Sequence, residues 1–126
     1  MADWGMLAQE NLGAAGELLR SGRFRSSVSR AYYAAFSAAA LELEAVRTTF
    51  PRDWDGPAHA SVPKLIERRL THLPASRRHD AKRSMRLLYN ARLGADYMPW
   101  QHFERKDASE ALKHATLVFR RLEVKL

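Results

Sequence analysis

The chain has 126 residues, 46% of them hydrophobic and 28% charged, a composition that excludes a disordered or fibrous protein and predicts one domain over residues 1–126. Its formal net charge of +7 favours a polyanionic or acidic partner over a cationic one. Because cysteine is absent, disulfides, thiolate metal sites and cysteine nucleophiles are excluded.

Glycine and proline divide the chain into helical blocks, and no run of alternating polar and β-branched residues predicts a strand. The first amphipathic helix should begin near Asp3 as its N-cap and end at Ser21-Gly22. The second helix should extend from Arg23 to about Val46. Its middle, Ala31 to Leu41, is apolar nearly all round, so we expect this helix to be central and buried on several sides.

The main loop is predicted from Thr48 to Pro57, a stretch rich in proline, glycine and aspartate. We expect Trp54 within this loop to pack onto the bundle. A shorter third helix should begin at about Ser61, with Pro63 tolerated in its first turn, and should end in the segment from Thr71 to Ala75.

A fourth helix is predicted from Ser76, as N-cap, to about Asp96. Asp107 stands three residues before Glu110, the spacing of a capping box, and so marks the start of the last helix. The whole pattern predicts an all-α protein, an up-and-down antiparallel bundle of four main helices plus one shorter helix.

The familiar signatures of catalytic and metal sites are absent from the sequence. There is no glycine-rich phosphate loop, no G-x-S-x-G and no H-E-x-x-H. No two of the five histidines are separated by three or four residues, the separation that places two ligands on one helix face. These histidines are His59, His72, His79, His102 and His114. We therefore expect no metal and no cofactor.

The chain shows no pattern typical of a membrane protein. The residues after Met1 do not form a basic stretch leading into an apolar run, and the apolar segment from Ala31 to Leu41 is too short to cross a bilayer. We expect a cytoplasmic protein with no membrane partner.

Positive charge is concentrated between Lys64 and Arg92, where nine basic side chains stand against two acidic ones. Arg78, Lys82 and Arg86, spaced by four, share one face of the fourth predicted helix. Such a face attracts phosphates because binding releases their condensed counterions. A solvated surface, or one that docks an acidic protein, explains the same charges equally well.

Polar residues also occur where the helices should be buried. Ser29, Tyr33 and Ser37 form a strip on the second helix, and their hydroxyls need hydrogen-bond partners. Arg92 rises from the edge of the apolar stripe of the fourth helix, and its guanidinium needs a carboxylate or a phosphate. The two alternatives are an internal pair with Asp96, with Tyr97 closing the core, and a phosphate site.

Two blocks of the sequence resemble the HEPN domain family of prokaryotes. The first is Gly-Arg-Phe-Arg-Ser-Ser-Val-Ser-Arg-Ala-Tyr-Tyr-Ala-Ala-Phe, residues 22–36, and the second runs from Leu88 to Tyr97 and ends in Ala-Asp-Tyr. With a helix opening near His59 between them, the resemblance extends from Asn11 to about Val118. It implies a helical bundle that forms homodimers and that in many members is encoded beside a minimal nucleotidyltransferase in a toxin–antitoxin module.

Active members of that family are similar in cutting RNA without a metal, using an arginine and a histidine a few residues further on. By position, Arg92 matches the arginine. Tyr97 occupies the place of the histidine, Leu93 replaces the polar residue often found after the arginine, and His102 lies too far along the chain. A phenol, with an ordinary pKa near ~10, transfers protons poorly at neutral pH, whereas imidazole, with a pKa near ~6.5, transfers them well.

Three interpretations of function follow. The first is a dimeric HEPN-type module that binds RNA or a nucleotide through Arg78, Lys82, Arg86 and Arg92, with Tyr33, Ser37 and Asp96 as supporting polar residues and a nucleotidyltransferase as a possible partner protein. The second is a weak metal-independent endoribonuclease, in which Arg92 holds the phosphate and Tyr97, His102 or His59 moves the proton. The third is a protein-interaction subunit with no nucleic-acid role.

Overall fold

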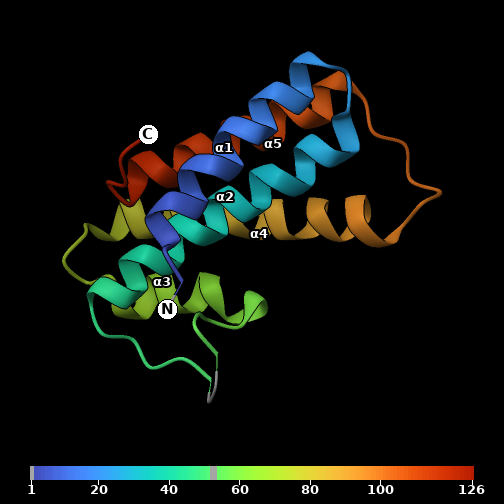
Figure 1. Ribbon diagram of the computed structural model, residues 1–126. Helices are drawn as coiled ribbons and strands as arrows, with labels where there is room; N and C mark the ends of the chain where they lie inside the picture. Colours follow the sequence, from blue (N-terminus) through green and yellow to red (C-terminus); the bar gives the residue numbers. More distant parts are fainter. Residues whose placement is uncertain (1, 52–53) are drawn as a thin grey trace.

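The structure, a computed structural model, describes residues 2–51 and 54–126. Helices are the only regular secondary structure in these ranges. The helices are α1 (Trp4–Arg20), α2 (Phe24–Ala45), α3 (Val62–Arg69), α4 (Ala75–Tyr97) and α5 (Arg105–Arg121), and a short 3-10 turn, η1 (His59–Ser61), precedes α3 (Figure 1). The predicted all-α class, with four main helices and one shorter helix, is confirmed. Residues 52–53 of the predicted loop lie outside the described residues.

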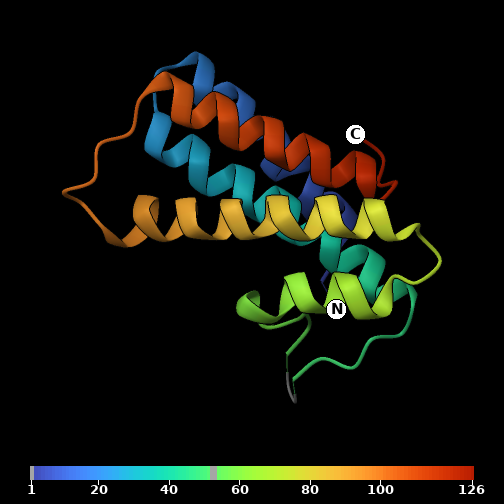
Figure 2. The same cartoon turned by 180° about the vertical axis from the view of Figure 1, so that it is seen from behind.

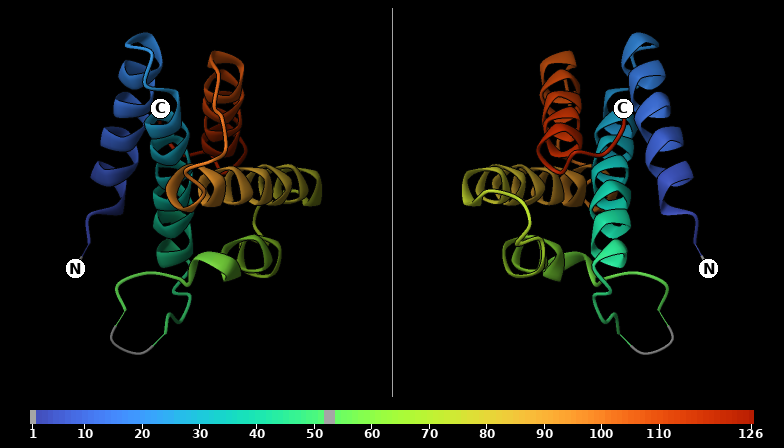
Figure 3. Two further views of the ribbon diagram at one scale, coloured as in Figure 1. Left: turned by 90° about the vertical axis from the view of Figure 1, so that its right-hand side faces the viewer. Right: turned by 90° about the vertical axis from the view of Figure 1, so that its left-hand side faces the viewer.

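The helices follow one another up and down, but they are not all aligned. Helices α1 and α2 form an antiparallel pair, and α5 packs beside α2. Seen from behind, α4 runs along one side of this group, with α3 on its outer side (Figure 2). Figure 3 shows α4 lying across α2 and α5 at a steep angle. None of the helices in the described ranges combines the length and the apolar character needed to cross a bilayer.

The core is centred on α2, as its apolar middle predicts. Ala31, Ala35 and Ala39 of α2 are fully buried, and their small side chains let neighbouring helices approach closely. Tyr32 of α2 and Phe119 of α5 are the largest fully buried side chains and supply much of the volume between the helices. Helix α2 contacts each of the other four helices, α1, α3, α4 and α5.

The predicted ends of α1 are confirmed. The side chain of Asp3 accepts a hydrogen bond from the backbone N–H of Met6 at 3.0 Å, which is the N-cap geometry. After α1 ends at Arg20, Gly22 adopts a φ of +79°, a left-handed conformation that favours glycine.

Two predicted helix starts are wrong by a short distance. Ser76 is not an N-cap, because α4 already begins at Ala75, directly after Pro74. The last helix begins one turn earlier than its predicted capping box: Glu104 is the N-cap, and its backbone N–H donates to the Asp107 carboxylate at 2.7 Å. Asp107 is therefore the N3 residue of the capping box and not its N-cap. The spacing of residues in the sequence does not distinguish these two positions.

The expectation that Trp54 packs onto the bundle is also wrong, since its side chain is 57% exposed. The loop is instead held by Trp4 of α1, whose indole N–H donates to the backbone oxygen of Asp55 at 3.3 Å. Gly56 makes this contact possible, because a Cβ there would lie 2.5 Å from the Trp4 ring. The segment leading into η1 is thus fixed against the start of α1.

Candidate functional site

Arg92 lies near the C-terminal end of α4 and is mostly buried, with its side chain 10% exposed. Its Nε donates to Oδ2 of Asp96, one turn further on, at 2.9 Å. Its Nη2 donates to the hydroxyl of Tyr33 on α2 at 2.8 Å and to the hydroxyl of Tyr97 at 3.3 Å. The guanidinium therefore joins α4 to α2.

Aromatic rings surround the same guanidinium. Its central carbon lies 5.3 Å from the ring centroids of Tyr33 and Tyr97 and 5.5 Å from that of Tyr32. Burial alone would lower the pKa of Arg92, but hydrogen bonds to Tyr33 and Asp96 and the nearby phenols raise it, so the group keeps its charge. The result is a fixed cation within a tyrosine cluster, defined here as Tyr32, Tyr33 and Tyr97.

The two alternatives for Arg92 are partly separated by this geometry. The internal pair with Asp96 is present, whereas Tyr97 is 61% exposed and does not close the core. Asp96 and Tyr97 together line an open groove of about 600 Å³ between α2 and the end of α4, which Arg25 and Arg30 also line. The polar partners of Arg92 thus reach solvent, although its own guanidinium is largely covered.

The polar strip predicted on α2 divides in the same way. Tyr33 contacts Arg92 directly, across 59 residues of sequence. Ser37 is almost fully buried one turn further along α2 and makes no hydrogen bond to Arg92. The sequence placed both hydroxyls on one face but could not tell which of them would meet α4.

His59 joins this cluster from the loop side. Its Nδ1 lies 2.7 Å from the Tyr32 hydroxyl, and its ring stacks on Phe36 with centroids 4.3 Å apart. Burial, and secondarily the charge of Arg92, lowers the pKa of His59, so the imidazole is neutral at neutral pH. Of the two histidines considered beside Arg92, His59 lies at the cluster, whereas His102 is exposed in the connection between α4 and α5.

Arg25 of α2 fixes the end of α4 and was not recognised as a site residue from the sequence. Its guanidinium donates to five backbone oxygens at the end of α4 and in the following turn, those of Gly94, Ala95, Met98, Pro99 and Gln101. A cation is favoured at this helix end, where the carbonyls are unpaired. Arg25 stands in the Gly-Arg-Phe-Arg block, the only sequence signal for it. It positions Asp96 and Tyr97 indirectly.

The predicted basic face of α4 is partly used within the protein. Arg78 donates to the backbone oxygens of Glu67 and Leu73, at 2.6 and 3.2 Å. Lys82 pairs with the Glu67 carboxylate. These two cations therefore attach α4 to α3, whereas Arg86, the third, is exposed.

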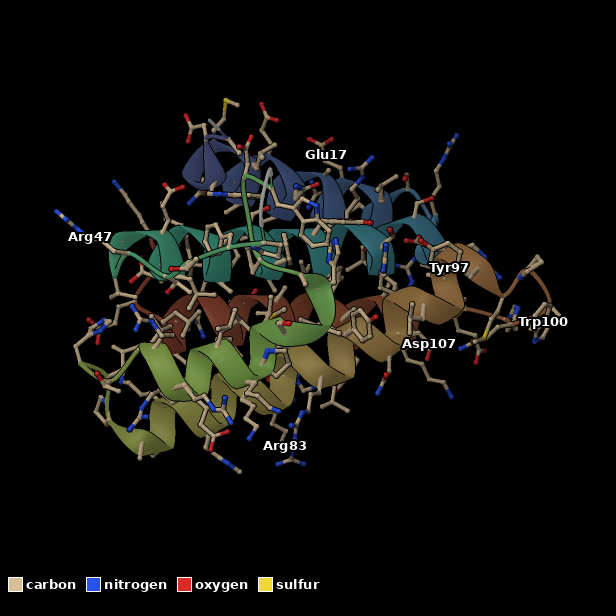
Figure 4. All side chains as sticks on the ribbon, turned by 90° about the horizontal axis from the view of Figure 1, so that it is seen from below. Glu17, Arg47, Arg83, Tyr97, Trp100 and Asp107 are labelled. Carbon is tan, nitrogen blue, oxygen red and sulfur yellow. The ribbon has the colours of Figure 1, made fainter. Side chains whose placement is uncertain are left out.

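Several cations nevertheless gather around Glu67. The pKa of the Glu67 carboxyl is lowered, first by its hydrogen bond from Lys82 and that cation's charge, and then by Arg86 and Arg68. Helices α3 and α4 thus present cations to one carboxylate from both sides. We define the α3/α4 basic surface as four exposed cations of these two helices, Lys64, Arg68, Arg83 and Arg86. Figure 4 shows Arg83 pointing away from the bundle, while Tyr97 lies on the side of α4 that faces α2.

Within the part of the chain that the structure describes, no three His, Asp or Glu side chains gather closely enough to hold a metal ion. The site therefore consists of a largely covered arginine with phenol and carboxylate partners, a neutral histidine, and an adjoining cationic surface. Such groups can bind phosphate and stack on bases.

Comparison with known proteins gives a match at the level of the family. No curated protein sequence matches the chain. The family model for the HEPN domain, however, matches residues 1–125 of the 126, which is nearly the whole chain. Membership of that family supports a nucleotide- or RNA-related role in general, and HEPN domains often act as dimers or bind nucleic acid. The chain belongs to the HEPN domain family.

Proposed function

We propose that this protein is an RNA- or nucleotide-binding HEPN module whose binding residues centre on α4. The observation that carries the proposal is the convergence of cations from α3 and α4 on the Glu67 carboxylate, which leaves a net positive surface beside the Arg92 cluster. A polyanion gains counterion-release free energy on such a surface. Arg78 and Lys82 contribute charge there while also holding α3 in place.

A salt titration with charge-reversed variants tests this proposal. The affinity for a short single-stranded RNA should fall log-linearly with salt, with a slope of roughly −0.7 per phosphate contacted. The double variant Lys64→Glu/Arg86→Glu should weaken binding on the order of tenfold or more and flatten that slope, since two phosphate contacts are lost.

The matched control is Lys106→Glu/Lys113→Glu, which changes the net charge equally but on α5, where both lysines are exposed. It should leave the affinity within about twofold. Equal losses in both double variants would indicate an unspecific charge effect. No RNA or nucleotide binding at low salt would reject the proposal, and binding only to an acidic protein would favour the protein-interaction subunit.

We further propose that the module is a homodimer in a toxin–antitoxin-like system with a nucleotidyltransferase partner. Exposed apolar side chains on α4 and directly after it, namely Leu87, Tyr97, Met98 and Trp100, support an interface there. Sedimentation should give twice the chain mass, and Trp100→Glu should shift it toward one chain. A monomer at all concentrations rejects the dimer. Co-expression with the product of an adjacent gene tests the partner.

A second candidate function, metal-independent RNA cleavage, is favoured by His59. The sequence lacks the motif histidine, but the structure brings His59 to Tyr32 and so next to Arg92. Cleavage of RNA in the presence of EDTA that is lost in both Arg92→Lys and His59→Gln would support it. Intact RNA after prolonged incubation with native protein would leave the binding function alone.

A further inference from the structure

A second cavity, apart from the groove at Asp96 and Tyr97, opens between α4 and the segment formed by η1 and α3. Its volume is about 310 Å³. The walls are His59, Ala60, Pro63 and Lys64 on one side and Arg86, Tyr89 and Asn90 of α4 on the other. Cavities that hold small ligands begin at about 300 Å³, so this one fits a single small molecule or one unit of a polymer.

The charged groups of this cavity are of one sign. Lys64 and Arg86 both carry positive charge, and none of the seven lining residues is acidic. The nearest carboxylate on α3, Glu67, is already paired with Lys82. An anion entering between Lys64 and Arg86 would therefore meet two cations, and Arg86 can offer it two parallel N–H donors.

Flat rings form another part of the lining. Tyr89 is half-buried and packs on Tyr32 with ring centroids 5.9 Å apart, so its position is fixed from behind. His59 is fixed in the same manner by stacking on Phe36. A planar heterocycle gains stacking energy on rings that are held in place, since little side-chain freedom is lost.

The hydrogen-bonding groups of the cavity are also set. Burial raises the pKa of Tyr32, so its hydroxyl keeps its proton and can donate it to Nδ1 of His59. The neutral imidazole then carries its own proton on Nε2 and presents a donor. Asn90 adds an amide, which both donates and accepts. This combination suits the edge of a nucleobase.

From these features we propose that the cavity binds one nucleotide, with the phosphate between Lys64 and Arg86 and the base against Tyr89 and His59. The ligand class is a nucleoside monophosphate, either free or as one unit of an RNA chain. The inference rests on the proposed function and gives it a specific subsite, which adjoins the Arg92 cluster at His59.

The test is a titration of the ¹⁵N-labelled protein, followed by NMR, with each of the four ribonucleoside monophosphates. We expect shifts in the backbone amide signals of residues 59–62, 64 and 86–90 and in the amide signals of the Asn90 side chain. Inorganic phosphate and the free nucleosides are titrated separately, and each should bind on the order of tenfold or more weakly than the nucleotide. A tetranucleotide is the fourth ligand.

Three variants and one control locate the ligand. Lys64→Gln and Arg86→Gln remove exposed cations without disturbing the core, and each should weaken nucleotide binding on the order of tenfold. Tyr89→Leu should weaken binding of the nucleotide by a similar factor and leave phosphate binding unchanged. Lys113→Gln removes an equal charge from an exposed position on α5, outside the cavity, and should change the affinity by less than twofold.

The outcomes separate this inference from the proposed function. Shifts with free nucleotides assign a soluble ligand, and shifts only with the tetranucleotide, weakened in the same variants, assign one unit of RNA; both support the site. RNA binding that ignores Lys64→Gln and Tyr89→Leu, with no mononucleotide shifts, overturns the subsite and leaves the proposed function standing. Nucleotide and phosphate binding of equal strength also overturns it, and absence of all binding rejects both.

Discussion

Arg92 and Asp96 form an ion pair on α4 in which the guanidinium is much less accessible than the carboxylate, with side chains 10% and 25% exposed. The hydroxyls of Tyr33 and Tyr97 complete the hydrogen bonding of the cation. The hydrogen bonds of the arginine to its partners therefore replace the water that it loses on burial, whereas the aspartate still contacts water. This asymmetry makes the two residues unequal as sites of substitution.

Asp96→Ala should lower the free energy of unfolding by about 1–3 kcal/mol, because a mostly buried guanidinium loses its carboxylate. In an Arg92→Met background the same change should cost less than about 0.5 kcal/mol, since no cation remains to be paired. Urea denaturation of the two single variants and the double variant measures the coupling. Additive effects would mean that the pair does not contribute to stability.

Arg25→Ala should release the turn after α4. The five backbone oxygens that Arg25 binds would hydrogen-bond to water instead. Amide hydrogen exchange should then accelerate at residues 97, 98, 100 and 101, with little change in α1. Arg25→Lys should not restore protection, because one ammonium has three donors and no planar fork. Unchanged exchange in Arg25→Ala would show that the turn is held by other contacts.

Two glycines should respond to alanine in opposite ways. Gly56→Ala places a methyl group 2.5 Å from the Trp4 ring, which should destabilise the fold by about 1–3 kcal/mol and separate the loop from α1. Gly13 lies in α1 with nothing within 4 Å of its added Cβ, so Gly13→Ala should stabilise the protein by about 0.5–1 kcal/mol. Thermal unfolding followed by circular dichroism compares them.

Stability should decrease on acidification because of His59. Its pKa is lower in the folded protein than in the unfolded chain, so below pH ~6.5 the unfolded state binds more protons and the free energy of unfolding falls. Above pH ~6.5 the effect vanishes. His59→Gln keeps an acceptor for the Tyr32 hydroxyl and should show a smaller slope between pH 6.5 and 5. Parallel curves for the two proteins would contradict this.

Glu42 affects the pH dependence of stability in the opposite direction to His59 and over a different pH range. Burial raises the pKa of its carboxyl in the folded protein. The folded state therefore binds more protons than the unfolded state at pH values just above the ordinary pKa of glutamate. Stability is therefore lost as the pH rises from about 4.5 through the raised pKa of the folded state. Glu42 and His59 thus change the free energy of unfolding in opposite directions as the pH rises.

The helices could be predicted because their signals are local. Asp3, Gly22 and Pro63 mark ends or first turns by their own chemistry, and the structure has them in those roles. The ends that shifted, at Ser76 and Asp107, are those where a second suitable residue stands within a turn. In each case the spacing of residues does not by itself select between the two starts.

The site was less predictable because its contacts are distant in sequence. The pairing of Arg92 with Asp96 follows from their separation by four residues, but the contacts of Tyr33 and Tyr32 with Arg92 join two helices. Likewise, the spacing of Arg78, Lys82 and Arg86 places them on one face of α4. It does not show that Arg78 and Lys82 contact Glu67 of α3. His59 and Arg25 have no spacing signal at all.

A substitution at Glu67 would change the net charge of the α3/α4 basic surface without removing any of its cations. It is the only acidic residue of α3 and offsets charge contributed by Lys82, Arg86 and Arg68. Exchanging it for glutamine would add one unit of positive charge and free an ammonium while keeping every basic side chain. One neutralising change at this position should therefore strengthen the proposed binding of a polyanion.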